Sequence, residues 1–132
     1  MRVFALWRGG ASLQAAEQAI ASIEAQPRPP ASLGDGRLLS GGVKLYIDGS
    51  GGARTAWMHD DWNKDLVGVD AGNRGYPANN PAYPEVFKQQ VALFTRKGVH
   101  VGTHAVGDRG IDVVVDTYAE VLKANPVKGL RH

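Results

Sequence analysis

Two short stretches decide the fold of this chain: Gly-Val-Lys-Leu-Tyr-Ile-Asp-Gly at residues 42–49 and Gly-Val-His-Val-Gly-Thr-His-Ala at residues 98–105. Each alternates apolar residues with polar residues or glycine, which is typical of a β-strand. Because successive side chains on a strand point to opposite faces, each stretch has one oily face and one face with polar groups. Lys44 lies on the polar face of the first strand, and His100 and His104 lie on that of the second. This placement indicates the interior of a barrel that carries functional side chains.

Working outward from these strands, strand-like and helical patterns alternate along the chain. We expect, in order, a strand at 2–7, a helix between Ser12 and Pro27, a glycine-rich connection at 31–42, a strand at 43–47, a loop at 48–82, a helix between Pro84 and Gly98, a strand at 99–104 and a helix between Asp108 and Asn125. Ser12 and Asp108 are expected to cap their helices. Such alternation implies a parallel sheet with helices packed on it. A complete (β/α)8 barrel needs about 250 residues. The expected fold is therefore α/β, a parallel βαβαβα slice of a (β/α)8 TIM barrel forming one partial domain over residues 1–132.

Composition excludes several classes of protein. The 15 basic and 13 acidic residues give a net charge of +2 without long runs, which gives no argument for nucleic acid or an anionic membrane as a partner. The absence of cysteine excludes disulfides and thiolate metal sites. No apolar run is long enough to span a bilayer, and the apolar N-terminal stretch breaks at Arg8, too early for a signal peptide. We therefore expect a cytoplasmic protein.

His104 is placed at the carboxyl end of its strand, where α/β folds carry ligand-binding and catalytic groups. It could be a metal ligand or a general base, and equally a histidine that hydrogen-bonds the backbone. His100 is expected to be structural. Four residues along a strand span ~13 Å at ~3.3 Å each, so His100 and His104 cannot share one metal.

Lys44 has apolar neighbours on both sides of it in the chain. A lysine buried there must be paired, neutralised or covalently modified, unless its side chain reaches solvent. Carboxylation of its amine would create two oxygens able to bridge two divalent metals.

The loop at 48–82 is long enough to suggest a functional or disordered segment. Its first turn, at residues 48–54, could offer backbone N–H groups to an anion, and Arg54 could bind a carboxylate or phosphate. Glycine content alone favours a flexible turn instead. Asp108 and Arg109 are similarly ambiguous. Asp108 could cap the helix that follows and Arg109 could be its exposed neighbour, which explains both residues without a binding role. Four aromatic residues could line a pocket or hold the loop in place: Trp57, Trp62, Tyr76 and Tyr83.

The stretch Gly-Val-Lys-Leu-Tyr-Ile-Asp-Gly-Ser-Gly-Gly-Ala-Arg-Thr-Ala at 42–56, taken with Thr-His-Ala-Val-Gly-Asp-Arg at 103–109, resembles the amidohydrolase superfamily, and within it the YtcJ-like metal-dependent hydrolases. The resemblance covers nearly all of the chain. It implies a barrel that holds one or two divalent metals, with zinc the expected ion, and that hydrolyses an amide or related C–N bond of a small molecule through metal-activated water. It also implies that Lys44, if carboxylated, and His104 are metal ligands.

The same resemblance implies an active-site rim formed by the segments that follow these two ligands: Asp48, Ser50, Arg54, Asp108 and Arg109. The His-x-His metal pair and the late aspartate of the superfamily have no counterpart here. His132 matches the residue before the strand that carries the next metal histidine, which is expected a few residues farther on, and is not itself a ligand. The chain thus resembles a central slice of such an enzyme, expected to be inactive by itself because two ligands fall short of the usual three. The alternative is a non-catalytic α/β domain that binds an anionic small molecule through residues 48–54, or that self-associates to hide open sheet edges.

Overall fold

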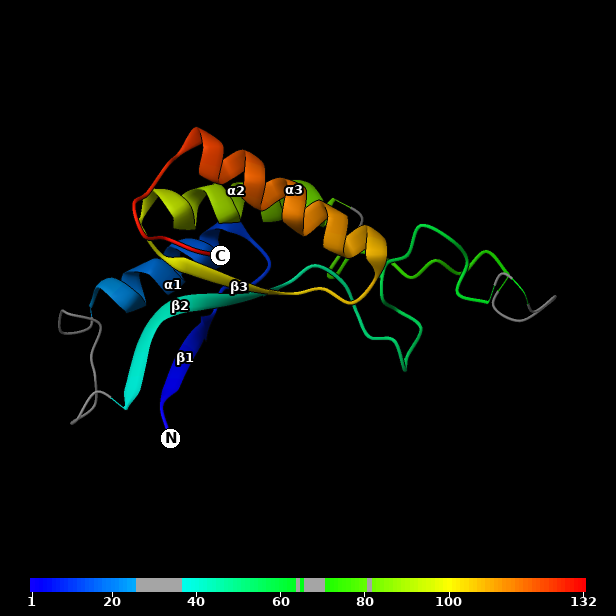
Figure 1. Ribbon diagram of the computed structural model, residues 1–132, viewed down its shortest axis with the longest axis horizontal. Coiled ribbons are helices and arrows are strands. Elements are labelled where there is room, and N and C mark those ends of the chain that lie inside the picture. Colours follow the sequence, from blue (N-terminus) through cyan, green and yellow to red (C-terminus); the bar gives the residue numbers. More distant parts are fainter. Residues whose placement is uncertain (26–36, 64, 66–70, 81) are drawn as a thin grey trace.

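The computed structural model describes residues 1–25, 37–63, 65, 71–80 and 82–132; the prolines expected to end the first helix lie outside these ranges. Three strands and three helices alternate along the chain, with the bounds β1 Val3–Arg8, α1 Leu13–Glu24, β2 Leu38–Tyr46, α2 Tyr83–Arg96, β3 His100–His104 and α3 Asp108–Ala124 (Figure 1). The strands form one parallel sheet in the order β1-β2-β3, which confirms the predicted α/β fold. Within the described residues, no helix has both the length and the apolar character needed to cross a membrane.

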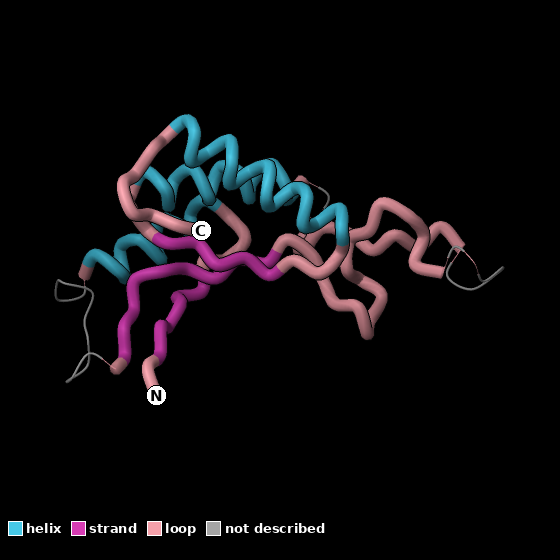
Figure 2. The backbone as a smooth tube through the Cα atoms, viewed as in Figure 1, coloured by secondary structure: helices cyan, strands magenta, loops and turns pink. Residues whose placement is uncertain are grey.

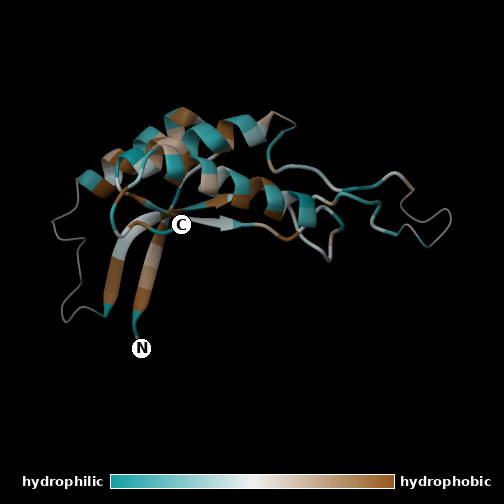
Figure 3. Cartoon of the chain, turned by 45° about the horizontal axis from the view of Figure 1, so that its top comes forward, coloured by the Kyte–Doolittle hydropathy of each residue, from teal (hydrophilic) through white to brown (hydrophobic). Residues whose placement is uncertain are grey.

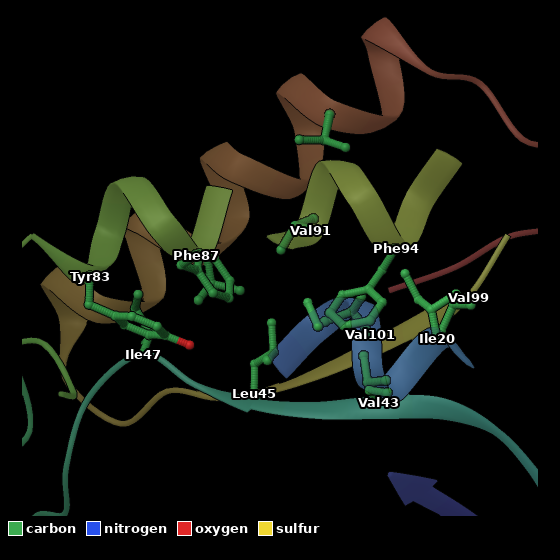
Figure 4. Packing of buried hydrophobic residues seen from close by; sticks show 14 residues of the cluster. Ile20, Val43, Leu45, Ile47, Tyr83, Phe87, Val91, Phe94, Val99 and Val101 are labelled. Carbon is green, nitrogen blue, oxygen red and sulfur yellow. The ribbon is translucent and has the colours of Figure 1, made fainter. Parts of the chain in front are cut away.

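The helices cover one face of the sheet, where α2 and α3 lie over the strands (Figures 1 and 2). Val43 and Leu45 of β2 are fully buried there, in a core that also contains Phe87, Val91 and Phe94 of α2 (Figure 4). Burying such side chains stabilises a fold by about 1.5–3 kcal/mol each. Because side chains alternate, the residues between them face away from the helices. The predicted separation into an oily face and a polar face is therefore confirmed for β2.

The start of β2 differs from the prediction. The strand begins at Leu38, inside the stretch expected to be a glycine-rich connection. The pairing with β1 shifts register between Ala5 and Leu6, so that Ser40 and Gly42 are paired while Gly41 is an extra residue. Such a bulge lets a strand continue through a residue that has no partner. Apart from Ser40, the paired residues of β1 and β2 that precede the bulge are apolar (Figure 3).

The helix starts agree with the prediction in one case and differ in the other. The Ser12 side chain accepts a hydrogen bond from the Ala15 N–H at 3.1 Å, which confirms it as the cap of α1. Asp108 is instead the first residue of α3, and Gly107 occupies the cap position without a side-chain bond. The Asp108 carboxylate is used elsewhere, as described below.

The long loop after β2 contains no helix or strand among its described residues, only an isolated bridge between Asp48 and Pro77. It extends from the carboxyl end of β2 beyond the body of the molecule (Figure 1). Its two arms pair through the Met58 N–H to the Arg74 carbonyl at 2.8 Å and the Trp62 N–H to the Asn73 carbonyl at 2.8 Å. The described part of the loop is therefore ordered by its own hydrogen bonds.

A buried glutamine on α2 fixes the turn between β1 and α1. Gln90 is fully buried, and its side-chain amide donates to the carbonyls of Gly9, Gly10 and Ser12 at 3.5, 3.3 and 3.0 Å. Its carbonyl oxygen accepts from the Tyr83 hydroxyl at 3.2 Å. Burial raises the pKa of Tyr83 to about 12. One side chain thus satisfies three carbonyls and a hydroxyl.

Replacing Gln90 by leucine is expected to lower the free energy of unfolding by about 2 kcal/mol, because leucine leaves the buried carbonyl of Gly9 and the buried hydroxyl of Tyr83 without this partner. Chemical denaturation measures the change. Gln89→Leu is the matched control, since Gln89 is exposed on the same helix and should move stability by less than about 0.5 kcal/mol. Equal stability of the two variants would contradict this role for Gln90.

Candidate active site

The predicted ligands lie on adjacent strands and on the face of the sheet that points away from the helices. Lys44 pairs with Gly102, and Tyr46 pairs with His104. Lys44 and His104 are therefore one strand apart and two residues out of register, which places their Cα atoms roughly 8 Å from each other at ordinary strand spacings. Both lie toward the carboxyl edge of the sheet, as expected for functional groups of a parallel α/β fold.

Tyr46 stands between them. The Lys44 ammonium lies 5.3 Å from the centroid of the Tyr46 ring, within range of a cation–π interaction. The rings of Tyr46 and His104 are 5.3 Å apart and tilted by 37°. Tyr46 is 49% exposed, so its ring forms part of the open surface. Sequence reasoning did not assign it a role, although its position two residues after Lys44 on the same face was the available signal.

The His104 ring is oriented by the backbone. Its Nε2 lies 2.6 Å from the carbonyl oxygen of Gly49 and 3.8 Å from Oδ1 of Asp48. Because a carbonyl only accepts, Nε2 carries the proton of this bond, and Nδ1 bears the lone pair in the neutral ring. The backbone-bonded histidine expected as one alternative is thus observed. This bond uses Nε2, so Nδ1 of His104 is left for another partner.

Asp48 is a buried carboxylate that joins two loops. It is 3% exposed and accepts hydrogen bonds from the N–H groups of Trp57 at 3.0 Å, Val106 at 3.1 Å and Gly107 at 2.7 Å. A Cβ atom on Gly110 would lie 2.8 Å from Oδ2, so the missing side chain makes room for this carboxylate. These contacts give Asp48 a positioning role behind the surface. Its predicted place among substrate-binding groups of the rim remains a prediction.

The turn after Asp48 uses its donors internally. The Ser50 N–H donates to the Thr55 hydroxyl at 3.0 Å, and the Ser50 hydroxyl accepts from the Ala53 N–H at 3.2 Å. The Arg54, Thr55 and Ala56 N–H groups donate to carbonyls of the same turn. These N–H groups are therefore committed within the turn rather than presented to an anion. Ser50 and Arg54 are exposed, and their place at the active-site rim remains a prediction.

Asp108 and Arg109 hold the long loop against the start of α3. The Asp108 carboxylate accepts from the N–H groups of His59 at 2.8 Å and Arg109 at 2.7 Å. The bond from the His59 backbone is the main reason that the pKa of Asp108 lies below its usual range. The Arg109 guanidinium lies 4.6 Å from the centroid of the Trp57 ring. The aromatic Trp57 therefore pins the loop, which was one of the two alternatives for these residues.

His100 and His132 gather at the opposite, amino end of β3. His100 hydrogen-bonds the carbonyl of Arg131, and its ring lies 5.8 Å from that of Phe4. The Val101 N–H donates to Nδ1 of His132 at 3.2 Å, and burial lowers the pKa of His132. These histidines have structural partners and are separated from His104 by the length of the strand, as predicted.

The described residues do not by themselves complete a metal centre. Among them, no group of three or more histidine, aspartate or glutamate residues is placed to hold a metal ion. Lys44 and His104 remain the candidate donors, and three protein ligands are usual for a catalytic zinc site.

Comparison with known proteins agrees with this arrangement. The chain is similar to Protein LONG AFTER FAR-RED 3 of Arabidopsis thaliana, with 32% identity over 89 residues, which is 67% of this chain and 14% of that protein. It also resembles crystal structures of two uncharacterized metal-dependent hydrolases. The one from Pyrococcus furiosus has 25% identity and a TM-score of 0.61 over 92% of this chain and 22% of that one. The one from Pyrococcus horikoshii OT3 has 27% identity and a TM-score of 0.55 over 78% of this chain and 19% of that one.

This chain therefore spans about a fifth of each of these hydrolases and 14% of the plant protein. The family model described as the amidohydrolase family matches residues 3–132, which include both motif-bearing strands and every site residue discussed above. The predicted superfamily is confirmed by that match. The chain belongs to the amidohydrolase family.

Proposed function

We propose that this chain supplies one sector of the active site of a metal-dependent hydrolase that cleaves an amide or related C–N bond, of the YtcJ-like kind and with zinc as its metal. The observation that carries the proposal is the placement of Lys44 and His104 on adjacent strands, on one face and at the carboxyl edge, with Tyr46 between them. Membership of the amidohydrolase family and likeness to metal-dependent hydrolases support it.

Each residue has a role in this proposal that follows from its contacts. His104 offers an imidazole nitrogen, with its ring held by the Gly49 carbonyl. Lys44 offers two oxygens once its neutral amine has added CO2 and lost a proton. Asp48 holds the loops that follow β2 and β3 in one arrangement. A bound divalent ion supplies an activated water.

Metal binding by the chain itself tests these assignments without relying on activity. Titration with Co²⁺, followed by its visible absorption, is expected to show weak binding that His104→Ala abolishes and that Lys44→Ala reduces. His59→Ala is the matched control, because His59 is exposed, lies in the long loop and is bonded to Asp112 at 2.8 Å. Equal Co²⁺ binding by wild type, His104→Ala and Lys44→Ala would remove both residues from the proposed metal site.

The isolated, metal-loaded chain is expected to show no turnover of N-acyl amino acids or other small amides, because its described residues supply at most two of the three ligands usually needed. Hydrolysis followed by amine release provides the measurement. Turnover that disappears in His104→Ala would show that the chain needs no further ligands and would overturn this part of the proposal.

A further inference from the structure

A pocket of about 280 Å³ opens beside the candidate active site, between the carboxyl ends of β1 and β2. Its lining includes Arg8, Gly10, Ala11, Lys44, Tyr46 and Asn79. It shares Lys44 and Tyr46 with the site described above. Arg8, Gly10 and Ala11 come from the end of β1 and the turn before α1, outside the candidate site described above.

With Lys44 unmodified, the charge that lines this pocket is positive and has no counter-ion among the described residues. Arg8 and Lys44 are register partners on neighbouring strands, so their side chains emerge side by side on the face away from the helices. Like charges placed directly opposite each other on a sheet destabilise it unless something neutralises them. No carboxylate lines the pocket, and no described residue forms an ion pair with Arg8 or Lys44. The pair therefore lacks a counter-ion within the described residues.

Two backbone N–H groups, those of Gly10 and Ala11, supply further hydrogen-bond donors beside these charges. The carbonyls of Gly9 and Gly10 both point to the Gln90 amide. In a planar trans peptide the N–H points opposite to the carbonyl, so the N–H groups of Gly10 and Ala11 are directed away from Gln90. Neither N–H has a hydrogen-bond acceptor among the described residues, and both residues line the pocket. Gln90 thus sets two free donors beside the two cations.

We propose that this pocket binds the carboxylate of a small molecule, with Arg8 as the principal ligand and the Gly10 and Ala11 N–H groups as further donors. A planar guanidinium matches a carboxylate through two parallel hydrogen bonds, and charged bonds of this kind are roughly twice as strong as neutral ones. The Tyr46 ring flanks the body of the ligand. The inference deepens the proposed function, on which it rests for naming the ligand as the substrate, because it assigns that substrate an anionic group next to the scissile bond. Binding itself requires neither metal nor turnover.

Two anions of the same chemical type could pair with Arg8. One is the carboxylate of a free ligand, and the other is a carbamate formed on Lys44. The proposal is that the free ligand fills the pocket. Lys44→Gln separates the sources, because glutamine cannot be carboxylated while Arg8 and the two N–H groups are unchanged.

The experiment is a metal-free NMR titration of the chain with N-acetylglycine, following the amide resonances of Gly10 and Ala11, with the neutral N-acetylglycinamide as the paired ligand. N-acetylglycine is expected to shift both resonances, N-acetylglycinamide to shift neither, and Arg8→Gln to weaken binding by about tenfold or more. Binding is expected to persist in Lys44→Gln and to stay dependent on Arg8. Arg96→Gln is the control for charge, since Arg96 is exposed in the last turn of α2 and its loss should leave affinity unchanged.

Three results would overturn the proposal: no binding of N-acetylglycine by the wild type, equal binding of the neutral amide, or equal affinity of Arg8→Gln and wild type. Loss of binding in Lys44→Gln would show that the Lys44 ammonium, and not Arg8 with the two N–H groups, holds the carboxylate, and would overturn it as well. Arg8 is exposed, and circular dichroism of Arg8→Gln establishes that a loss of binding is not a loss of fold. Because no metal is present, these outcomes are independent of the Co²⁺ titration.

Discussion

Replacing Asp48 by alanine is expected to lower the free energy of unfolding by about 3 kcal/mol or more. The substitution leaves the N–H groups of Trp57, Val106 and Gly107 without their acceptor, at the place where the loops after β2 and β3 meet. Each buried donor without a partner costs about 1–3 kcal/mol. Water can reach Val106, which is exposed, but Gly107 is buried. Most of the effect is therefore expected from Gly107 and Trp57.

Urea denaturation followed by far-ultraviolet circular dichroism measures this change. Asp116→Ala is the matched control, because Asp116 is an exposed carboxylate on α3 and its removal should change stability by less than about 0.5 kcal/mol. Asp48→Asn is expected to remain destabilising, since its amide nitrogen would face backbone donors instead of accepting from them. An Asp48→Ala midpoint equal to that of Asp116→Ala would refute the positioning role.

Replacing Gly107 by alanine is expected to detach the long loop from α3, at a cost of about 3 kcal/mol, the upper end for added atoms in packed sites. Gly107 has φ −73° and ψ 146°, which any residue adopts, so the backbone itself is not strained by the change. The expected loss of stability comes from steric overlap alone. A Cβ atom would lie 2.0 Å from the carbonyl oxygen of Trp57 and 2.5 Å from its nitrogen, and backbone atoms cannot rotate away.

Limited proteolysis provides the readout that a general loss of stability would not, because cleavage should appear first within residues 57–63 while the helices stay protected. Gly52→Ala is the matched control, since a Cβ atom there would meet nothing within 4 Å. The prediction fails if Gly107→Ala and Gly52→Ala are cleaved at the same rate in this segment.

The sheet could be predicted from sequence because burial imposes a period of two on β2 and β3. The helices were found for the same reason, since their apolar stripes face that sheet. The start of β2 could not be predicted. Residues 38–42 contain two glycines, and only the pairing with β1, which leaves Gly41 as an extra residue, makes a strand of them. That pairing is a property of a neighbouring segment and is invisible in the local pattern.

The candidate site, too, could be predicted only in part from the local sequence pattern. His104 could be placed at the carboxyl edge of the sheet because it ends the expected strand at 99–104. Lys44 could be placed only on the polar face of its strand, and the pairing with β3 sets it near that edge. The contacts of Asp48 could not be foreseen, since its acceptor role depends on residues far along the chain. In the sequence alone, Arg8 is only the residue that interrupts an apolar stretch. Its significance comes from register, which sets it opposite Lys44.

The hydrogen bonds of Asp48 to Val106 and Gly107 join residues that are 58 and 59 positions apart in the chain. Because Asp48, Val106 and Gly107 lie just beyond the ends of β2 and β3, these hydrogen bonds can form only after the two strands have paired and the long loop between them has closed. The carboxyl edge of the sheet is therefore expected to assemble late in folding. Changes to Asp48 should accelerate unfolding more than they slow folding. The edge that carries the candidate chemistry is thus expected to open before the core between α2 and β2 is disturbed.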